Sequence, residues 1–278
     1  MKSLIITLIS SLVLFINGYS QQYDFSNYSI NDGLSQSVVN CIFQDSKGFI
    51  WIGTQNGLNR FNGEKFDVFN YNPVDTHSIS NNWIYAISED KNGNLWIGTK
   101  NGLNKFNVRQ KKFERITYRT KYTHDVTRYS YDNICLKDGK ILINTPPLIS
   151  IFDPEENSFS HYHSKLEYDE AVKDVKIPVL EDRNGKIWIG STKGLTSFSR
   201  KTKEFTTYSF IDTNNSLLDN VDITSIFSDK KDALWIETTA GLFSYNTESD
   251  HFEEYECTVI NSENFSLENS CIRTILED

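Results

Sequence analysis

The chain is built from one segment that recurs about every 46 residues. The run DSKGFIWIGTQNGLNRF begins at Asp45 and returns with few changes as DKNGNLWIGTKNGLNKF at Asp90. Two more altered copies begin at Asp182 and Asp229, and a worn copy begins at Lys137. The central position of the five copies is held by Trp51, Trp96, Leu142, Trp188 and Trp235, at steps of 45, 46, 46 and 47 residues. A fixed period of this length is the mark of a repeat architecture, so the fold must place similar units side by side.

Each copy divides into four short strands separated by turns. In the second copy an alternating run over 84–87 precedes an Asp-x-x-Gly turn, in which Asp bonds downstream backbone and Gly takes a positive φ. A strand over 95–99, an Asn-Gly turn, a strand over 103–106 and a Phe-x-x-Ile fourth strand ending at Ile116 follow. Four antiparallel strands per repeat are typical of one blade of a β-propeller. Helical solenoids are excluded because no copy has a helical pattern, and β-helices have much shorter repeats.

The sequence therefore predicts an all-β fold, a β-propeller of four-stranded antiparallel blades. We expect the tryptophan anchors Trp51, Trp96, Trp188 and Trp235 to pack between neighbouring blades, where large aromatic rings bury much area. The Phe-x-x-Tyr pairs are expected in the same place.

The two ends of the chain predict how the ring closes. Phe25-x-x-Tyr28 matches a fourth strand with no blade before it, and Cys271–Asp278 matches Trp83–Asp90. We expect five blades plus part of a sixth, a domain incomplete at its C-terminus, and seven blades when complete, which needs roughly 60 more residues. An open arc leaves strand edges unpaired, so self-association is expected.

Residues 1–20 are typical of a secretory signal peptide, with Lys2 before an apolar run over 4–16 and small residues at Gly18 and Ser20. A membrane anchor is the alternative, but the run is shorter than the roughly 20 residues that span a bilayer. We expect export, with 21–278 forming the N-terminal part of the propeller. A net charge of −9 argues against a nucleic-acid or anionic-membrane partner.

Motifs for catalysis, cofactors or metals are not found. The Asp-x-Asn-Gly turns lack the further ligands of a calcium loop, and His161 and His163 share a strand face without a third ligand. A sialidase propeller would need a tyrosine nucleophile and an arginine cluster for the substrate carboxylate, and the arginines recur at no common blade position. We expect no cofactor, no metal and no catalytic residue. The four cysteines, Cys41, Cys135, Cys257 and Cys271, have no zinc spacing; Cys257 and Cys271 could pair, but free buried thiols are favoured.

A binding face remains the best functional prediction. Propellers commonly bind ligands near the central channel, on the loops before the first strand and between the second and third strands. Amides with aromatic rings on these loops suit a sugar, although loops are polar in any case. The candidate ligand-binding residues are Asn56, Asn82, Trp83, Asn101, Tyr131 and Lys193.

The run from Asn31 to Gly63, with Asp-x-x-Gly, Trp-Ile-Gly-Thr and Gly-Leu-Asn-x-Phe, resembles the two-component regulator propellers of Bacteroidetes. The resemblance implies the periplasmic sensor of a longer receptor: two propellers, a β-sandwich, one transmembrane helix and a cytoplasmic output, most often a histidine kinase. It also implies an oligosaccharide or other small ligand, and a homodimer. The membrane would be reached only through a segment beyond residue 278. A secreted interaction scaffold, or less plausibly a propeller glycosidase, lyase or quinone enzyme, is the alternative.

The sequence departs from the family pattern in two copies. The third copy has Leu142 and Asn144 in place of Trp and Gly, and Pro146-Pro147 in place of the Asn-Gly turn. The fifth has Glu237 at the glycine position. A worn copy indicates either relaxed packing, which we favour, or a site that has displaced the consensus.

Overall fold

The computed structural model of the chain describes residues 26–116, 132–145, 148–163, 177–191, 194–208, 210–211, 217–218, 221–239, 241–246 and 251–255. Beyond one 3-10 turn at Ile30–Asp32, the secondary structure of these residues is β-strand. The signal-peptide prediction, Phe25 and Cys271–Asp278 lie outside the described residues, so the predictions on the chain ends stay predictions.

Twenty of the strands form five four-stranded antiparallel sheets, each in simple sequence order. The first two blades contain β1 (Val39–Gln44), β2 (Ile50–Thr54), β3 (Gly57–Phe61), β4 (Phe66–Phe69), β5 (Ile84–Glu89), β6 (Leu95–Thr99), β7 (Gly102–Asn107) and β8 (Lys112–Ile116). The third and fourth contain β9 (Asp132–Cys135), β10 (Ile141–Thr145), β11 (Leu148–Asp153), β12 (Ser158–His163), β13 (Val179–Glu181), β14 (Ile187–Ser191), β15 (Gly194–Ser199) and β16 (Glu204–Tyr208). The fifth contains β19 (Ile223–Ser228), β20 (Leu234–Thr238), β21 (Gly241–Asn246) and β22 (His251–Glu254), and β17 (Phe210–Ile211) pairs with β18 (Leu217–Leu218) on the link before it.

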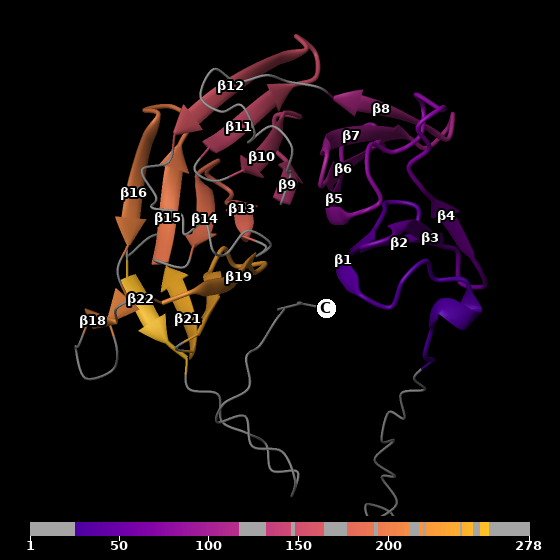
Figure 1. The fold of residues 1–278 in the computed structure, drawn as a ribbon. Coiled ribbons are helices and arrows are strands. Elements are labelled where there is room, and N and C mark those ends of the chain that lie inside the picture. Colours follow the sequence, from indigo (N-terminus) through magenta and orange to yellow (C-terminus); the bar gives the residue numbers. More distant parts are fainter. Residues whose placement is uncertain are drawn as a thin grey trace, which may run out of the picture.

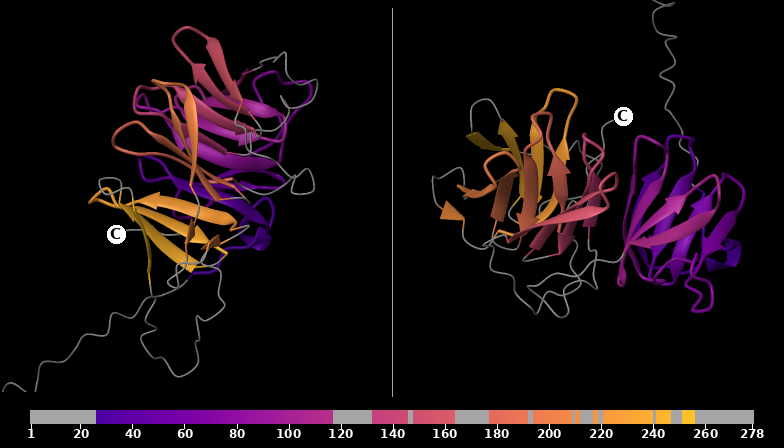
Figure 2. Two further views of the ribbon diagram at one scale, coloured as in Figure 1. Left: turned by 90° about the vertical axis from the view of Figure 1, so that its left-hand side faces the viewer. Right: turned by 90° about the horizontal axis from the view of Figure 1, so that it is seen from above.

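The five sheets are arranged radially about an axis, which confirms the predicted β-propeller. In Figure 1 the first strand of each sheet lies nearest the centre and the fourth lies at the rim. Figure 2 shows the sheets following one another around the axis in sequence order, from indigo to yellow. The link between blades 1 and 2, residues 70–83, therefore returns from the rim to the centre.

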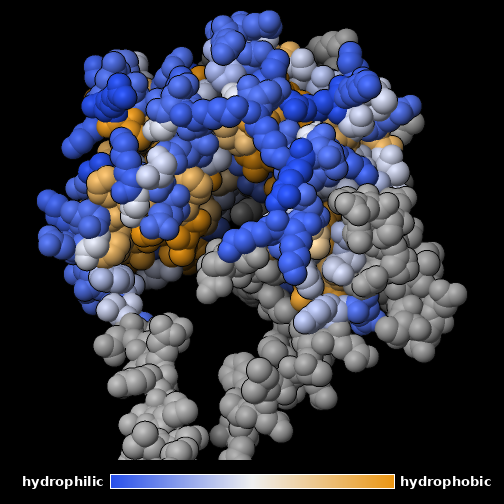
Figure 3. Space-filling model, turned by 180° about the vertical axis from the view of Figure 1, so that it is seen from behind, coloured by the Kyte–Doolittle hydropathy of each residue, from blue (hydrophilic) through white to orange (hydrophobic). Residues whose placement is uncertain are grey.

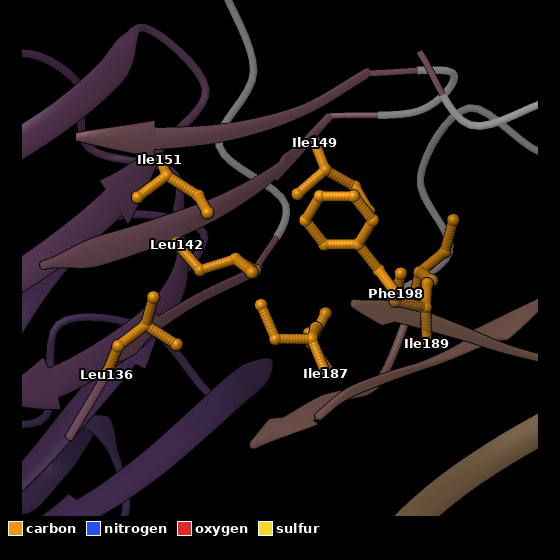
Figure 4. Close-up of a cluster of buried hydrophobic side chains, with 9 residues drawn as sticks. Leu136, Leu142, Ile149, Ile151, Ile187, Ile189 and Phe198 are labelled. Atoms are coloured by element: carbon orange, nitrogen blue, oxygen red, sulfur yellow. The ribbon is translucent and has the colours of Figure 1, made fainter. Parts of the chain in front are cut away.

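The core is divided among the four seams between neighbouring blades. Each seam holds one cluster of buried side chains, and every cluster takes residues from both blades. Figure 4 shows the seam of blades 3 and 4, where Leu136, Leu142, Ile149 and Ile151 face Ile187, Ile189 and Phe198. A blade thus has no core of its own, because its two faces are buried only by its neighbours.

The tryptophans lie in these seams, as predicted. The ring centroids of Trp51 and Phe106 of the next blade are 5.5 Å apart, and those of Trp188 and Tyr245 of the next blade are 5.0 Å apart. Trp96 meets Phe152 of blade 3 at 5.8 Å. These three tryptophans are at most 1% exposed. Trp235, in the last described blade, is half-buried and packs on Tyr255 of its own blade.

A hydrogen bond fixes each tryptophan to the turn before it. The indole N–H of Trp51 donates to Asp45 at 2.8 Å, and the same pair recurs as Trp96–Asp90, Trp188–Asp182 and Trp235–Asp229 at 3.0–3.1 Å. The second oxygen of Asp45 accepts the backbone N–H groups of Lys47 and Phe49. One carboxylate therefore closes the turn and aims the ring. In blade 5 the indole donor is the main reason that the pKa of Asp229 lies below its ordinary value.

The worn third blade has lost both partners of this bond. Leu142 replaces the tryptophan, and Leu136 replaces the aspartate that the turn otherwise carries. Both leucines are at most 1% exposed and pack in the seam with blade 4. Replacing donor and acceptor together leaves no buried polar group unsatisfied, which makes the exchange nearly neutral. At these two positions the third blade is buried like its neighbours, and the expectation of relaxed packing for the blade as a whole stays a prediction.

The glycine of Trp-Ile-Gly is needed for the approach of the next blade. A Cβ on Gly53 would lie 2.7 Å from Ile84 Cγ2, and one on Gly190 would lie 2.8 Å from Ile223. Asn144 and Glu237 hold this position in blades 3 and 5, and both are 2% exposed. Asn144 and Glu237 are thus buried at the position where, in the regular seams, the next blade packs against glycine.

The face of blade 1 that lies away from blade 2 is covered by no described blade. Ile42 is 67% exposed and Val39 is 40% exposed, whereas Ile84, at the position of Val39 in blade 2, is fully buried. Figure 3 shows hydrophobic residues in orange beside a surface of hydrophilic residues in blue. The contrast shows how strongly the burial of a blade depends on its neighbour.

We predict that the Asp–Trp bond acts as a coupled pair. Asp182→Ala leaves the Trp188 indole and two turn N–H groups without their acceptor, and Trp188→Phe removes the donor. A double-mutant cycle by urea unfolding, followed by circular dichroism, should give a coupling of about 1.5–3 kcal/mol. Combining Asp182→Ala with Trp235→Phe, from the next blade, should be additive. Additive losses within the Asp182–Trp188 pair would contradict this assignment.

Candidate functional site

The link between blades 1 and 2 is held against the rim of blade 2. The Phe113 N–H donates to the His77 carbonyl at 2.9 Å, so the link runs beside the outer strand β8. Arg115 donates to the carbonyls of Ser78 and Asp75 at 3.0 and 3.1 Å. Its guanidinium also lies 5.2 Å from the centroid of the Tyr71 ring. Arg115 therefore clamps the link through its guanidinium donors, a role that the sequence analysis did not find.

At its end the link is joined to two turns of the channel mouth. The Asn82 carbonyl accepts the Gly57 N–H at 2.7 Å, in the turn between the second and third strands of blade 1. The Trp83 carbonyl accepts the Lys100 N–H at 3.0 Å, in the corresponding turn of blade 2. These bonds bring together five side chains that we call the mouth site: Asn56, Asn82, Trp83, Lys100 and Asn101.

Four of the six predicted ligand-binding residues thus belong to one surface. The Asn82 amide accepts the Tyr71 N–H at 2.6 Å and donates to Asn56 at 3.4 Å, so it holds the link in place. Asn56 and Asn101 are exposed and make equivalent long contacts, 3.5 Å, to the Ser35 and Ser80 carbonyls. Asn56 and Asn101 each keep at least one N–H donor and one acceptor position of the amide for a ligand.

Trp83 and Lys100 form the aromatic and cationic part of the mouth site. The Lys100 ammonium lies 4.9 Å from the centroid of the Trp83 ring, a cation–π distance. Trp83 also lies 6.2 Å from the ring of Tyr85, and both Trp83 and Lys100 are half-buried. Lys100 is the charged residue of this surface.

A buried polar network supports the turn beneath each half of the mouth site. In blade 1 the Ser35 hydroxyl lies 2.9 Å from that of Thr54 and accepts the Asn59 amide at 2.8 Å. Ser80, Thr99 and Asn104 repeat these bonds in blade 2 with the same distances. The sequence contained a signal for this network, because the serine, threonine and asparagine of the two blades are each 45 residues apart. Hydrogen bonds among these polar side chains therefore hold the two turns that carry the mouth site.

The remaining predicted residues lie elsewhere. Tyr131, Lys193, Cys257 and Cys271 fall outside the described residues, and their predictions stay untested. Cys41 and Cys135 are half-buried, and burial raises the pKa of Cys135 to about 11.

The histidine pair on β12 does not form a metal centre with its described neighbours. His161 Nδ1 lies 2.8 Å from the Ser150 hydroxyl, its ring stacks on Phe159, and burial lowers its pKa. Among the described residues no three His, Cys, Asp or Glu side chains are grouped to hold a metal ion. No helix within the described ranges has the length and apolar character to cross a membrane.

Comparison with known proteins identifies the repeat. Residues 33–56 and 78–101 match the family described as two component regulator propeller. The first two blades each carry a two-component regulator propeller repeat. The matched segments contain Asn56 and the other three described ligand candidates, so the mouth site is made from family repeats.

Solved and curated relatives agree with this assignment. The chain is 25% identical to the extracellular domain of the hybrid two component system BT3049 of B. thetaiotaomicron, with a TM-score of 0.57, covering 91% of this chain and 39% of that one. It is 40% identical over 75 residues to histidine kinase P4 of Formosa agariphila, which is 27% of this chain and 6% of that protein. Virginiamycin B lyase of Staphylococcus aureus shares the fold alone, at 13% identity and a TM-score of 0.64, over 87% of this chain and 76% of that one. The chain thus spans less than half of the two-component relatives.

We predict that Arg115→Met loosens the link without unfolding the blades. Four backbone carbonyls of the link, at positions 72, 75, 78 and 79, lose their charged donor, so hydrogen exchange over 71–79 should speed up about tenfold or more. Arg109→Met is the matched control, because no described hydrogen bond uses the Arg109 side chain. Equal exchange in both variants would show that Arg115 does not hold the link.

Proposed function

We propose that the chain is part of the periplasmic ligand-sensing propeller of a transmembrane two-component receptor. The proposal is supported above all by the likeness to the extracellular domain of a hybrid two component system, which extends over 91% of the chain. The family repeats and the histidine kinase relative support it independently. The receptor would detect an oligosaccharide or similar small ligand and control a histidine kinase and transcription.

The mouth site has the chemistry that such a ligand requires. Sugar hydroxyls need donors and acceptors side by side, and the exposed amides of Asn56 and Asn101 offer both. An aromatic ring with a partly exposed surface, here Trp83, suits the apolar face of a pyranose. Its supporting turns are fixed before binding, which lowers the ordering cost of association.

Signalling requires that ligand binding favour one arrangement of the receptor over another. The mouth site joins two blades and the link between them, so a ligand there contacts groups from both sides of one seam. A ligand that binds one seam geometry better than another shifts the population towards it by the difference in affinity. In a homodimeric receptor, which we propose here, that shift would be passed to the output domain.

We predict that Trp83→Ala lowers the affinity for the activating oligosaccharide at least tenfold, because ring stacking and the support of Lys100 are both lost. Isothermal titration of the chain against an oligosaccharide panel, followed by the variants, measures this. Tyr28→Ala is the control, since Tyr28 is a half-exposed ring that packs on Phe61 away from the mouth site. Binding that is equal in both variants, or no oligosaccharide binding by the folded chain, would count against the proposal.

A further inference from the structure

The charge of the mouth site indicates what kind of oligosaccharide it takes. Building on the proposed function, we propose that the mouth site selects acidic oligosaccharides, and that Lys100, positioned by Trp83, binds their carboxylate or sulfate group.

Both the backbone and the side chain of Lys100 contact Trp83. Its backbone N–H donates to the Trp83 carbonyl at 3.0 Å, and its ammonium lies 4.9 Å from the centroid of the Trp83 ring. A lysine side chain normally loses much rotamer freedom when it binds a partner. Here the indole already restricts the ammonium, so less of that cost falls on ligand binding.

The Lys100 ammonium also has donors to spare. Three lysines elsewhere in the described residues show the alternative, in which the ammonium is used by the protein: Lys140 pairs with Asp153 at 2.6 Å, Lys137 donates to the Asp182 carbonyl at 2.9 Å, and Lys186 donates to the Tyr208 hydroxyl at 2.7 Å. No described carboxylate lies within ion-pair distance of Lys100. An ammonium has three N–H donors, and the indole face satisfies none of them by a hydrogen bond.

A cation in this place has a specific use in an acidic chain. The net charge of −9 repels an anionic ligand at long range, so selective binding of an anion needs a local positive group. The rest of the mouth site, Asn56, Asn82, Trp83 and Asn101, is uncharged and would accept the hydroxyl groups of neutral and acidic sugars alike. The preference for an acidic sugar therefore depends on Lys100.

A different role for Lys100 would be to support the Trp83 ring only. The two roles differ in which ligands are affected by its removal. A supporting role predicts equal losses for neutral and acidic ligands, whereas an anion-binding role predicts a loss confined to the acidic ones.

The test is titration of the full chain with three matched ligands of equal length: an oligogalacturonide, its carboxyl-reduced neutral form, and a sulfated galactan oligosaccharide. We expect one of the two acidic ligands to bind at least tenfold more tightly than the neutral one, which also distinguishes carboxylate from sulfate. Lys100→Gln should weaken the acidic ligand about five- to tenfold and leave the neutral one unchanged, since a hydrogen bond to a charged group is lost. Raising the salt concentration should weaken only the acidic ligand.

Two variants keep the result interpretable. Lys100→Arg retains the charge and should keep affinity within about threefold. Lys105→Gln removes a lysine that lies 5.4 Å from the centroid of the Trp96 ring, which is away from the mouth site, and should leave affinity unchanged. Tight binding of the neutral form, or equal losses for both forms in Lys100→Gln, overturns the inference while leaving the sensor proposal in place. No binding of any oligosaccharide by the folded chain overturns both.

Discussion

The fold depends on the packing of one blade against the next. A four-stranded sheet that is apolar on both faces cannot be stable alone, because each face must be removed from water by another element. The four buried clusters each draw on two blades, and the open face of blade 1 leaves Ile42 two-thirds exposed. Stability therefore rises with each blade added, as in other repeat proteins.

The Asp–Trp pair explains why the repeat is so regular in sequence. The tryptophan ring packs against the neighbouring blade, so its indole N–H is buried and needs a hydrogen-bond acceptor. The turn aspartate provides that acceptor, and its other oxygen closes the hairpin. The third blade shows that the requirement is joint, since leucine at positions 136 and 142 fills the seam without any polar group. A change at one of the two positions alone would bury an unsatisfied donor or acceptor.

Most of this architecture could be predicted from the sequence, because the repeat fixes both the strand order and the face on which each large side chain lies. The tryptophans in the seams and the Asp-x-x-Gly turns follow from local chemistry and were predicted correctly. The role of Leu136 was missed, since an apolar residue in a turn carries no signal until its partner is known. The clamp by Arg115 was missed for a related reason: it acts on backbone carbonyls 36 to 43 residues away, and backbone carbonyls have no sequence pattern.

The candidate site was likewise predicted only in part from the sequence. Loop positions alone grouped Asn56, Asn82, Trp83 and Asn101, but their sequence did not show that Asn82 is used to hold the link or that Lys100 joins the aromatic ring. The tryptophans therefore differ in role. Those in the seams are structural, and Trp83 is the one that we propose contacts the ligand.

That difference can be measured directly in the five indole N–H signals of an ¹H–¹⁵N NMR spectrum. The account predicts slow hydrogen exchange for Trp51, Trp96 and Trp188, whose indoles are buried and bonded to aspartate, and fast exchange for Trp83. Added oligosaccharide should shift the Trp83 signal first. Fast exchange at the three seam tryptophans, or ligand shifts confined to them, would contradict both the packing and the placement of the site.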